Sequence, residues 1–82
     1  MMRAVERALS IFDAFDMDNP TLTLQGIGTR IGLSKATTHR LVNSLNECGY
    51  LVRVGNHHYA LSLKFLRLAG LVRSTLTIRD IA

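Results

Sequence analysis

The sequence predicts a mainly α-helical domain that carries one small β-hairpin. The chain has 82 residues, 48% of them apolar and 20% charged, which is enough for one folded domain and argues against disorder. Apolar side chains recur every three or four residues before residue 50, which is the helical period. Residues 50–61 instead alternate around a Gly-Asn pair, which is typical of two short strands joined by a turn.

Residues 3–15 are predicted to form the first helix. Their apolar side chains cover an arc of roughly 160°, wider than the ~100° stripe that a surface helix needs. We expect the surplus, on the side of Ala4 and Ile11, to face a second subunit, unless a later helix covers it. Asn19-Pro20 then forms a turn, and the ring of Pro20 excludes a continuing helix.

A short second helix is predicted over residues 23–31. Thr23 provides a hydroxyl N-cap, and Gly32 provides the left-handed residue that ends the helix. Gly26 and Gly28 each lower the helix propensity by about 1 kcal/mol relative to alanine, so tertiary packing has to hold this helix.

Ser34 and Gly49 delimit the third helix as its N-cap and its C′ residue. One face of this helix is predicted to be buried, with the cysteine as a small core residue, and consists of Thr38, Leu41, Val42, Leu45 and Cys48. The opposite face is polar and consists of Ala36, Arg40, Asn43 and Glu47, flanked by Thr37, His39 and Ser44.

The second and third helices are joined by only a short turn that begins at Gly32. Two short helices across such a turn form a helix-turn-helix, here over about residues 24–43. The predicted strands, residues 50–54 and 58–61, follow directly, with residues 55–57 at the hairpin tip. A hairpin in this place makes the winged variant of the helix-turn-helix fold.

Ser62 is predicted to cap a fourth helix over residues 63–73. Residues 75–82 have the pattern of the first turns of another helix, with Thr77 as its N-cap. That pattern stops at Ala82 with neither a cap residue nor a Gly or Pro, so we expect the chain to be a fragment of something longer.

The charge is positive overall and unevenly distributed. The net charge is +4, yet residues 1–20 hold two basic and four acidic side chains, whereas residues 21–82 hold eight basic and two acidic. A basic body favours a polyanionic partner, most often nucleic acid. Cys48 is the only cysteine, which excludes an internal disulfide and suits a reducing compartment such as the cytoplasm. We expect no membrane span and no secretory signal, since no apolar run is long enough for either.

The polar face of the third helix has the residue types that read DNA. Arg40 can donate to O6 and N7 of guanine, and Asn43 is the side-chain type that pairs with adenine. The hydroxyl of Ser34 and the backbone amides at the helix start suit a phosphate. Glu47 would repel phosphates and marks the end of the contact zone. The residues of this helix predicted to contact DNA are Ser34, Lys35, Ala36, Thr37, His39, Arg40 and Asn43.

Two other classes of function have less support. An enzyme is not predicted, because the sequence has no phosphate loop, carboxylate pair or Ser-His-Asp arrangement, and no cofactor is expected. His57 and His58 are adjacent on a strand, so they point to opposite faces and do not ligate one metal ion together with His39. A winged helix that binds protein instead of DNA stays open as the alternative. Lys35 and Arg40, with no acidic residue between them, favour DNA.

Two segments carry a recognisable pattern, and they read LTLQGIGTRIGLSKATTHRLVNSLNECGYL and YALSLKFLRLAG. Together with a preceding helix VERALSIFDAF, they resemble the N-terminal DNA-binding domain of the IclR family of bacterial transcription regulators. The resemblance covers residues 4–82. The sequence departs from the family pattern at Thr38, where an aliphatic residue is usual, and at Gly26 and Gly28, in a helix usually richer in Ala and Glu.

The resemblance implies a ligand-responsive transcription regulator, with repression and activation both open. It also implies a homodimer on a palindromic operator in double-stranded DNA, a tetramer in the full-length parent, and contact between DNA-binding domains through the first helix. Residues 1–74 would be the DNA-binding domain. Residues 75–82 would start a linker helix to an effector-binding domain, absent from this chain, that takes a small-molecule effector. Further phosphate contacts are expected from the start of the second helix and from the wing, at Thr23, Gln25, Arg53, His57 and His58.

Overall fold

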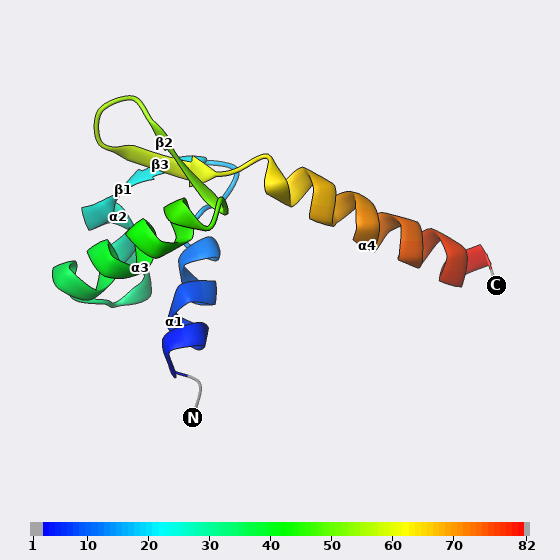
Figure 1. The fold of residues 1–82 in the computed structure, drawn as a ribbon, viewed down its shortest axis with the longest axis horizontal. Helices are drawn as coiled ribbons and strands as arrows, with labels where there is room; N and C mark the ends of the chain where they lie inside the picture. Colours follow the sequence, from blue (N-terminus) through cyan, green and yellow to red (C-terminus); the bar gives the residue numbers. More distant parts are fainter. Residues whose placement is uncertain (1–2, 82) are drawn as a thin grey trace.

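A computed structural model describes residues 3–81, with side chains for residues 3–76. These residues form four helices and a three-stranded antiparallel sheet (Figure 1). The predicted class, mainly helical with a small β-hairpin, is confirmed. In chain order the elements are α1 (Arg3–Phe12), β1 (Thr21–Thr23), α2 (Leu24–Ile31), α3 (Lys35–Glu47), β2 (Leu51–Val54), β3 (His58–Leu61) and α4 (Lys64–Ile81).

The sheet has the strand order β1-β3-β2, so β3 lies in the middle. The hairpin of β2 and β3 was predicted, but β1 was not. Thr21 pairs with Ala60 and Thr23 with His58, which makes β1 a third strand rather than a loop. A three-residue segment beside a proline is too short for its alternation of side chains to predict a strand. Its pairing partner also lies almost forty residues further along the chain, so the local sequence gives no sign of the pairing.

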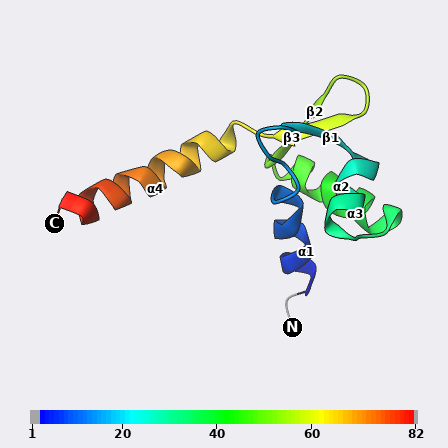
Figure 2. The same ribbon diagram turned by 180° about the vertical axis from the view of Figure 1, so that it is seen from behind.

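One core holds the first three helices and the sheet together. Each of these elements contributes at least one buried apolar side chain, and the core residues are Ile11, Ala14, Leu22, Ile27, Val42, Leu51 and Tyr59. None of them belongs to α4. The view from behind shows the consequence, since α4 extends away from the body of the domain (Figure 2).

The first helix differs from its prediction at both its end and its exposed edge. It ends at Phe12, and the chain continues through i→i−3 backbone bonds such as Ala14 N to Ile11 O at 3.1 Å, which is a tighter 3₁₀-type turn. Ile11 is fully buried, so the surplus apolar surface is not on its side. The large apolar side chains left exposed are instead Val5 (46%) and Leu9 (55%).

The predicted caps of the helix-turn-helix are confirmed. Thr23 Oγ1 accepts a hydrogen bond from Gly26 N at 3.0 Å, and Ser34 Oγ accepts one from Thr37 N at 3.2 Å. Gly32 has φ +72°, the left-handed conformation that ends α2. These local interactions define both ends of the turn between α2 and α3.

The packing around Gly28 explains why α2 has a glycine, a residue of low helix propensity, at this position. It is buried, and a Cβ atom there would lie 2.9 Å from Thr38 Oγ1 and 3.1 Å from the Leu33 carbonyl oxygen. The first distance is shorter than real Cβ contacts show, and the second is tighter than most of them. Glycine therefore lets α2 and α3 approach closely at the corner of the helix-turn-helix.

The end of α3 contradicts one prediction about its buried face. Gly49 N bonds to Asn46 O and Tyr50 N to Leu45 O, which with φ +88° at Gly49 is a Schellman motif. Cys48 precedes this glycine and is exposed, so its assignment to the core was wrong. Residues 46–49 are all exposed, because the last turn of α3 extends beyond the elements that cover its apolar face.

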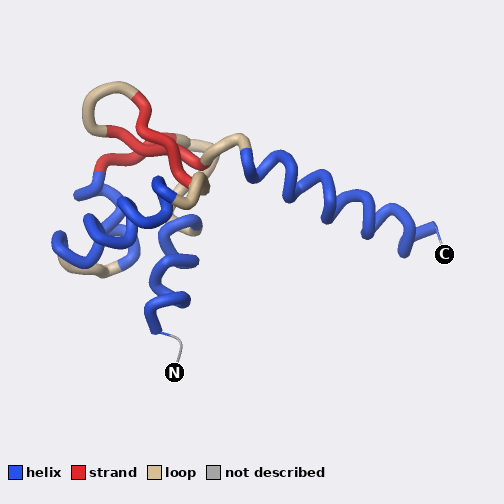
Figure 3. Tube along the Cα trace, in the orientation of Figure 1, coloured by secondary structure: helices blue, strands red, loops and turns tan. Residues whose placement is uncertain are grey.

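The fourth helix is continuous where the sequence predicted two helices. It runs unbroken from Lys64 to Ile81 (Figure 3), so Thr77 lies inside a helix and is not an N-cap. Thr75 was expected near a break between two helices. Its hydroxyl instead donates to Leu71 O at 3.2 Å, which is a bond within one helix. Across the described residues, no helix is both long and apolar enough to cross a membrane.

Candidate nucleic-acid interface

The outward face of α3 is the first component of the site. Its exposed residues include Lys35, Ala36, His39, Arg40 and Asn43. The inward face carries Thr38 and Val42, which are 1% and 0% exposed. The hydroxyl of Thr38 donates to Ser34 O at 2.8 Å, so this polar side chain is buried with a partner. The predicted division of α3 into a core face and a polar outer face is confirmed at these positions.

Ser34 organises the first turn of α3. Its hydroxyl accepts from Thr37 N at 3.2 Å and donates to Thr37 Oγ1 at 3.0 Å. Both hydroxyl groups are therefore held in place at a helix N-terminus, where the helix dipole favours an anion. Ser34 is exposed, so this first turn lies at the surface of the domain.

A shallow groove of about 460 Å³ connects α3 with two other parts of the chain. The start of α2 forms one wall, and the hairpin of β2 and β3 forms another. The groove brings together seven of the residues predicted to contact DNA, and the full lining consists of Thr23, Leu24, Gln25, Lys35, His39, Asn43, Arg53, His57 and Tyr59. Side chains that were expected to contact DNA, from α3 and from the wing formed by β2 and β3, thus face a common groove.

The remaining predicted residues lie outside this groove. Arg40 is exposed on α3 but does not line it, and the same is true of Ala36 and Ser34, whereas Thr37 is half-buried. His58 pairs with Val54 on the sheet, one position before the buried Tyr59. Because neighbouring side chains of a strand point to opposite faces, His58 faces away from the side that Tyr59 shares with the groove.

The histidine arrangement also bears on metal binding. His57 lines the groove with His39, but His58 does not. Among the residues that the structure describes, no three His, Cys, Asp or Glu side chains are placed to hold one metal ion.

The tip of the wing is held by a side chain of its own strand. Arg53 Nη2 donates to Asn56 O at 2.8 Å across the turn, and Gly55 adopts φ +67° there. The same arginine lines the groove, paired across the sheet with Tyr59. Arg53 therefore both closes the hairpin turn and adds positive charge to the groove wall.

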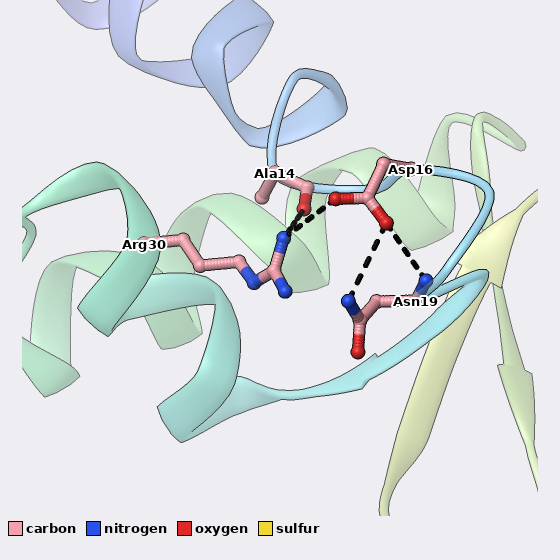
Figure 4. A network of polar contacts seen from close by, with 4 residues as sticks. All are labelled: Ala14, Asp16, Asn19 and Arg30. Carbon is pink, nitrogen blue, oxygen red and sulfur yellow. Dashed lines mark hydrogen bonds and ion pairs between the residues drawn. The ribbon is translucent and has the colours of Figure 1, made fainter.

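Charge is separated between the groove and the loop after α1. The groove is lined by the cations Lys35 and Arg53 and by no carboxylate. In the loop, Asp16 accepts from Arg30 of α2 at 3.0 Å, and the same Arg30 nitrogen donates to Ala14 O at 3.0 Å (Figure 4). The bond from Arg30, helped by the backbone N–H of Asn19, holds the pKa of the Asp16 carboxyl below its usual value. Arg30 thus fastens the loop to α2.

Two groove residues were missed by the sequence analysis. Leu24 is half-buried at the start of α2, and Tyr59 is 7% exposed in the middle of the sheet. Tyr59 belongs to the core, and Leu24 packs against it. Only the tertiary placement of the hairpin against α3 shows that they line the groove as well.

These elements define a class of protein. A helix-turn-helix whose second helix exposes a basic polar face, followed directly by a β-hairpin that shares a groove with it, is a winged helix-turn-helix domain. A family model described as the IclR helix-turn-helix domain matches residues 4–55. The chain belongs to the IclR family, as its resemblance predicted, and is a DNA-binding domain of that family of transcription regulators rather than an enzyme.

Known relatives agree with this assignment. The chain is 36% identical over 80 residues to the HTH-type transcriptional regulator KipR of Bacillus subtilis and 34% identical over 81 residues to XynR of Escherichia coli. Each match covers 98% of this chain but only 32% of the relative, so the chain spans about a third of their length. The solved structure of an IclR-family regulator from Brucella abortus has a TM-score of 0.89 and 34% identity, covering 100% of this chain and 32% of that one.

Proposed function

We propose that this domain binds double-stranded DNA in a sequence-specific manner by placing α3 in the major groove and the wing beside the sugar-phosphate backbone. One observation carries the proposal: the exposed face of α3 and the wing share a groove lined by cations and by no carboxylate. The major groove admits one α-helix, and a basic concave surface attracts the phosphates on either side of it.

Base reading is assigned to the outermost side chains of α3. Arg40 is exposed and carries a guanidinium, which donates in bidentate fashion to guanine O6 and N7. Asn43 lies about one turn further along the helix and is the side-chain type that pairs with adenine. Ala36 is exposed one turn before Arg40, where its methyl group suits the methyl group of thymine.

Phosphate contacts are assigned to the groove walls and to the start of α3. Ser34, Thr37 and the adjoining backbone amides suit one phosphate, because they form a helix N-terminus. The other candidates surround the groove or belong to the wing, and they are Thr23, Gln25, Lys35, His39, Arg53, His57 and His58. Such contacts orient the protein on DNA without reading its sequence.

We further propose that the whole protein is a cytoplasmic regulator that binds a palindromic operator as a dimer. Two copies related by a twofold axis match the symmetry of a palindrome. The exposed side chains of Val5 and Leu9 on α1 suit a contact between copies. Most of each relative lies outside the match. Residues 1–74 are assigned as the DNA-binding domain, and residues 75–82 as the start of a linker helix to an effector-binding domain that takes a small molecule.

Selection of bound sequences from a random pool of DNA duplexes tests this function. Enrichment of one sequence, with affinity that falls steeply as salt rises, supports DNA binding. No enrichment and no salt dependence would favour the protein-binding winged helix instead.

Two arginine variants sharpen that experiment. Arg40→Ala should weaken binding to the enriched duplex by about 1–3 kcal/mol and relax discrimination at one base pair. Arg67→Ala removes the same charge from an exposed position on α4 and should change affinity much less. Equal losses in both variants would show that α3 does not read the bases.

A further inference from the structure

Ser62 occupies the junction between β3 and α4 and is buried, with 9% of its surface exposed. Three hydrogen bonds meet at this residue. Its hydroxyl donates to Gly49 O at 2.6 Å and accepts from Lys64 N at 3.2 Å, while its backbone N–H donates to Tyr50 O at 3.0 Å. We call these four residues the Ser62 junction.

The bonds of the Ser62 junction connect two helices. Gly49 and Tyr50 are the residues of the Schellman motif that ends α3, so their carbonyl groups have fixed positions relative to that helix. Lys64 is the first residue of α4, where the Ser62 hydroxyl accepts one of the backbone N–H groups that a helix start leaves unpaired. A single buried hydroxyl thus bonds to the end of α3 and to the beginning of α4.

Aromatic contacts support the same turn of α4 and no later one. Phe65 packs edge-on against Phe12 at 4.9 Å and against Tyr50 at 5.7 Å between ring centroids. Lys64 Nζ lies 4.3 Å from the centroid of the Tyr50 ring. Leu66 is 70% exposed, Leu68 is half-buried, and the side chains of residues 69–76 are all exposed. Within the described residues, the direction of α4 is therefore determined by its first residues, up to Leu68.

We propose that Ser62 is a positioning residue that sets the angle between α3 and α4. The Ser62 hydroxyl joins the two helices through its bonds to Lys64 N and Gly49 O, so a tilt of α4 has to stretch one of these bonds or move the end of α3 with it. The aromatic contacts are less directional, so they hold the distance between the helices more strictly than the angle. Where α4 leads into the rest of a longer regulator, which rests on the proposed function, Ser62 sets the direction of that connection.

The angle can be measured without DNA, so its outcome is independent of the proposed function. In a Cys48→Ser background, spin labels at Ser44→Cys on α3 and Arg73→Cys on α4 report the distance between the helices by pulsed electron paramagnetic resonance. All three positions are exposed. The parent should give one narrow distance distribution, and Ser62→Ala should give a broader and shifted one.

Three variants separate positioning from general destabilisation. Ser62→Thr keeps both hydroxyl bonds and should retain the narrow distribution, as should Ser74→Ala, which removes an exposed hydroxyl from α4. Ser62→Asp keeps an N-cap acceptor for Lys64 N but has no proton to donate to Gly49 O at neutral pH, so it should broaden the distribution while α4 still begins at the same residue. It also serves if Ser62→Ala unfolds by circular dichroism. An unchanged distribution in folded Ser62→Ala or Ser62→Asp would overturn the proposal.

Discussion

At the corner between α2 and α3, caps and contacts between the two helices fix each turn, whereas the described part of α4 packs against other elements only near its beginning. The corner has hydroxyl caps at Thr23 and Ser34 and a left-handed residue at Gly32. It also has Gly28, which lacks a Cβ atom and so lets α2 and α3 approach closely. By contrast, no described side chain of α4 belongs to the core, and Leu71, Val72 and Leu76 are each more than half exposed.

The difference concerns what determines the position of a helix. Burial of Ile27 and Val42 in a shared core, with fixed caps, gives the helix-turn-helix one arrangement. Beyond the half-buried Leu68, the described side chains of α4 are all exposed, so they neither gain nor lose much burial when the helix moves. Paired substitutions in the two regions can therefore break or sharpen this contrast.

The largest expected effect is on core packing. Ile27→Ala should lower the free energy of unfolding by about 2–5 kcal/mol, because it leaves a cavity where Ile27 is fully buried. Leu71→Ala on α4 removes an apolar side chain that is 58% exposed and should cost less than about 0.5 kcal/mol. Urea unfolding followed by circular dichroism measures both. Similar losses would mean that α4 is packed in solution, which would remove the contrast.

Gly28 in α2 and Gly70 in α4 should respond to alanine substitution with opposite signs. Gly28→Ala should destabilise the domain by about 1–3 kcal/mol, since its Cβ meets Thr38 Oγ1 at 2.9 Å and the Leu33 carbonyl at 3.1 Å. Gly70→Ala has no atom within 4 Å of the new Cβ and should stabilise α4 by about 0.5–1 kcal/mol. Thermal unfolding midpoints of the two variants give the signs. A stabilising Gly28→Ala would refute the close-approach role.

A smaller effect is expected at the cap of α3. Ser34→Ala removes the acceptor for Thr37 N and should cost about 1 kcal/mol of unfolding free energy. Ser34→Asp keeps an acceptor and should recover most of this loss, whereas Ser74→Ala on the exposed face of α4 serves as the control. If alanine at both positions had the same effect, the cap would contribute nothing specific to α3.

The smallest effect is a dependence of stability on acid pH. The bond from Arg30 lowers the pKa of Asp16 in the folded state below its ordinary value of 3.8. The unfolded state therefore binds a proton more readily, so this contribution is present above that value and is lost as pH falls through the folded pKa. Asp16→Asn should flatten the fall in melting temperature at acid pH, while Asp18→Asn in the same loop should not. Parallel profiles for all three proteins would show that the pair adds no stability.

Local chemistry explains which parts of the fold were predictable. The caps at Thr23 and Ser34 and the left-handed glycines at 32 and 49 depend on neighbours within a few residues, so the sequence pattern was sufficient. The strand β1 depends on pairing with β3, far away in the chain, and a three-residue pattern contains no information on that partner. The exposure of Cys48 depends on how far its neighbours extend along α3, which helical periodicity alone does not contain.

The candidate interface shows the same division. Helical periodicity placed Arg40 and Asn43 on the outer face of α3 and His39 at its flank, because a helix surface follows from residue spacing. The wing histidines could not be separated without the register of the hairpin, which puts His57 in the groove and His58 on the other face of the sheet. Arg53 was expected at phosphate, but its bond to the turn carbonyl required the folded hairpin.

That bond from Arg53 to Asn56 O has a consequence for the energetics of association. A wing that closes its own turn loses little conformational entropy when it meets a duplex, because the loop is already ordered. The contribution of the wing to affinity should then appear mainly as a lower dissociation rate of the complex rather than as a higher association rate. Restraining the wing further, for example by a cross-strand disulfide, should lengthen the lifetime of the complex only slightly. Lengthening the turn with glycines should shorten that lifetime.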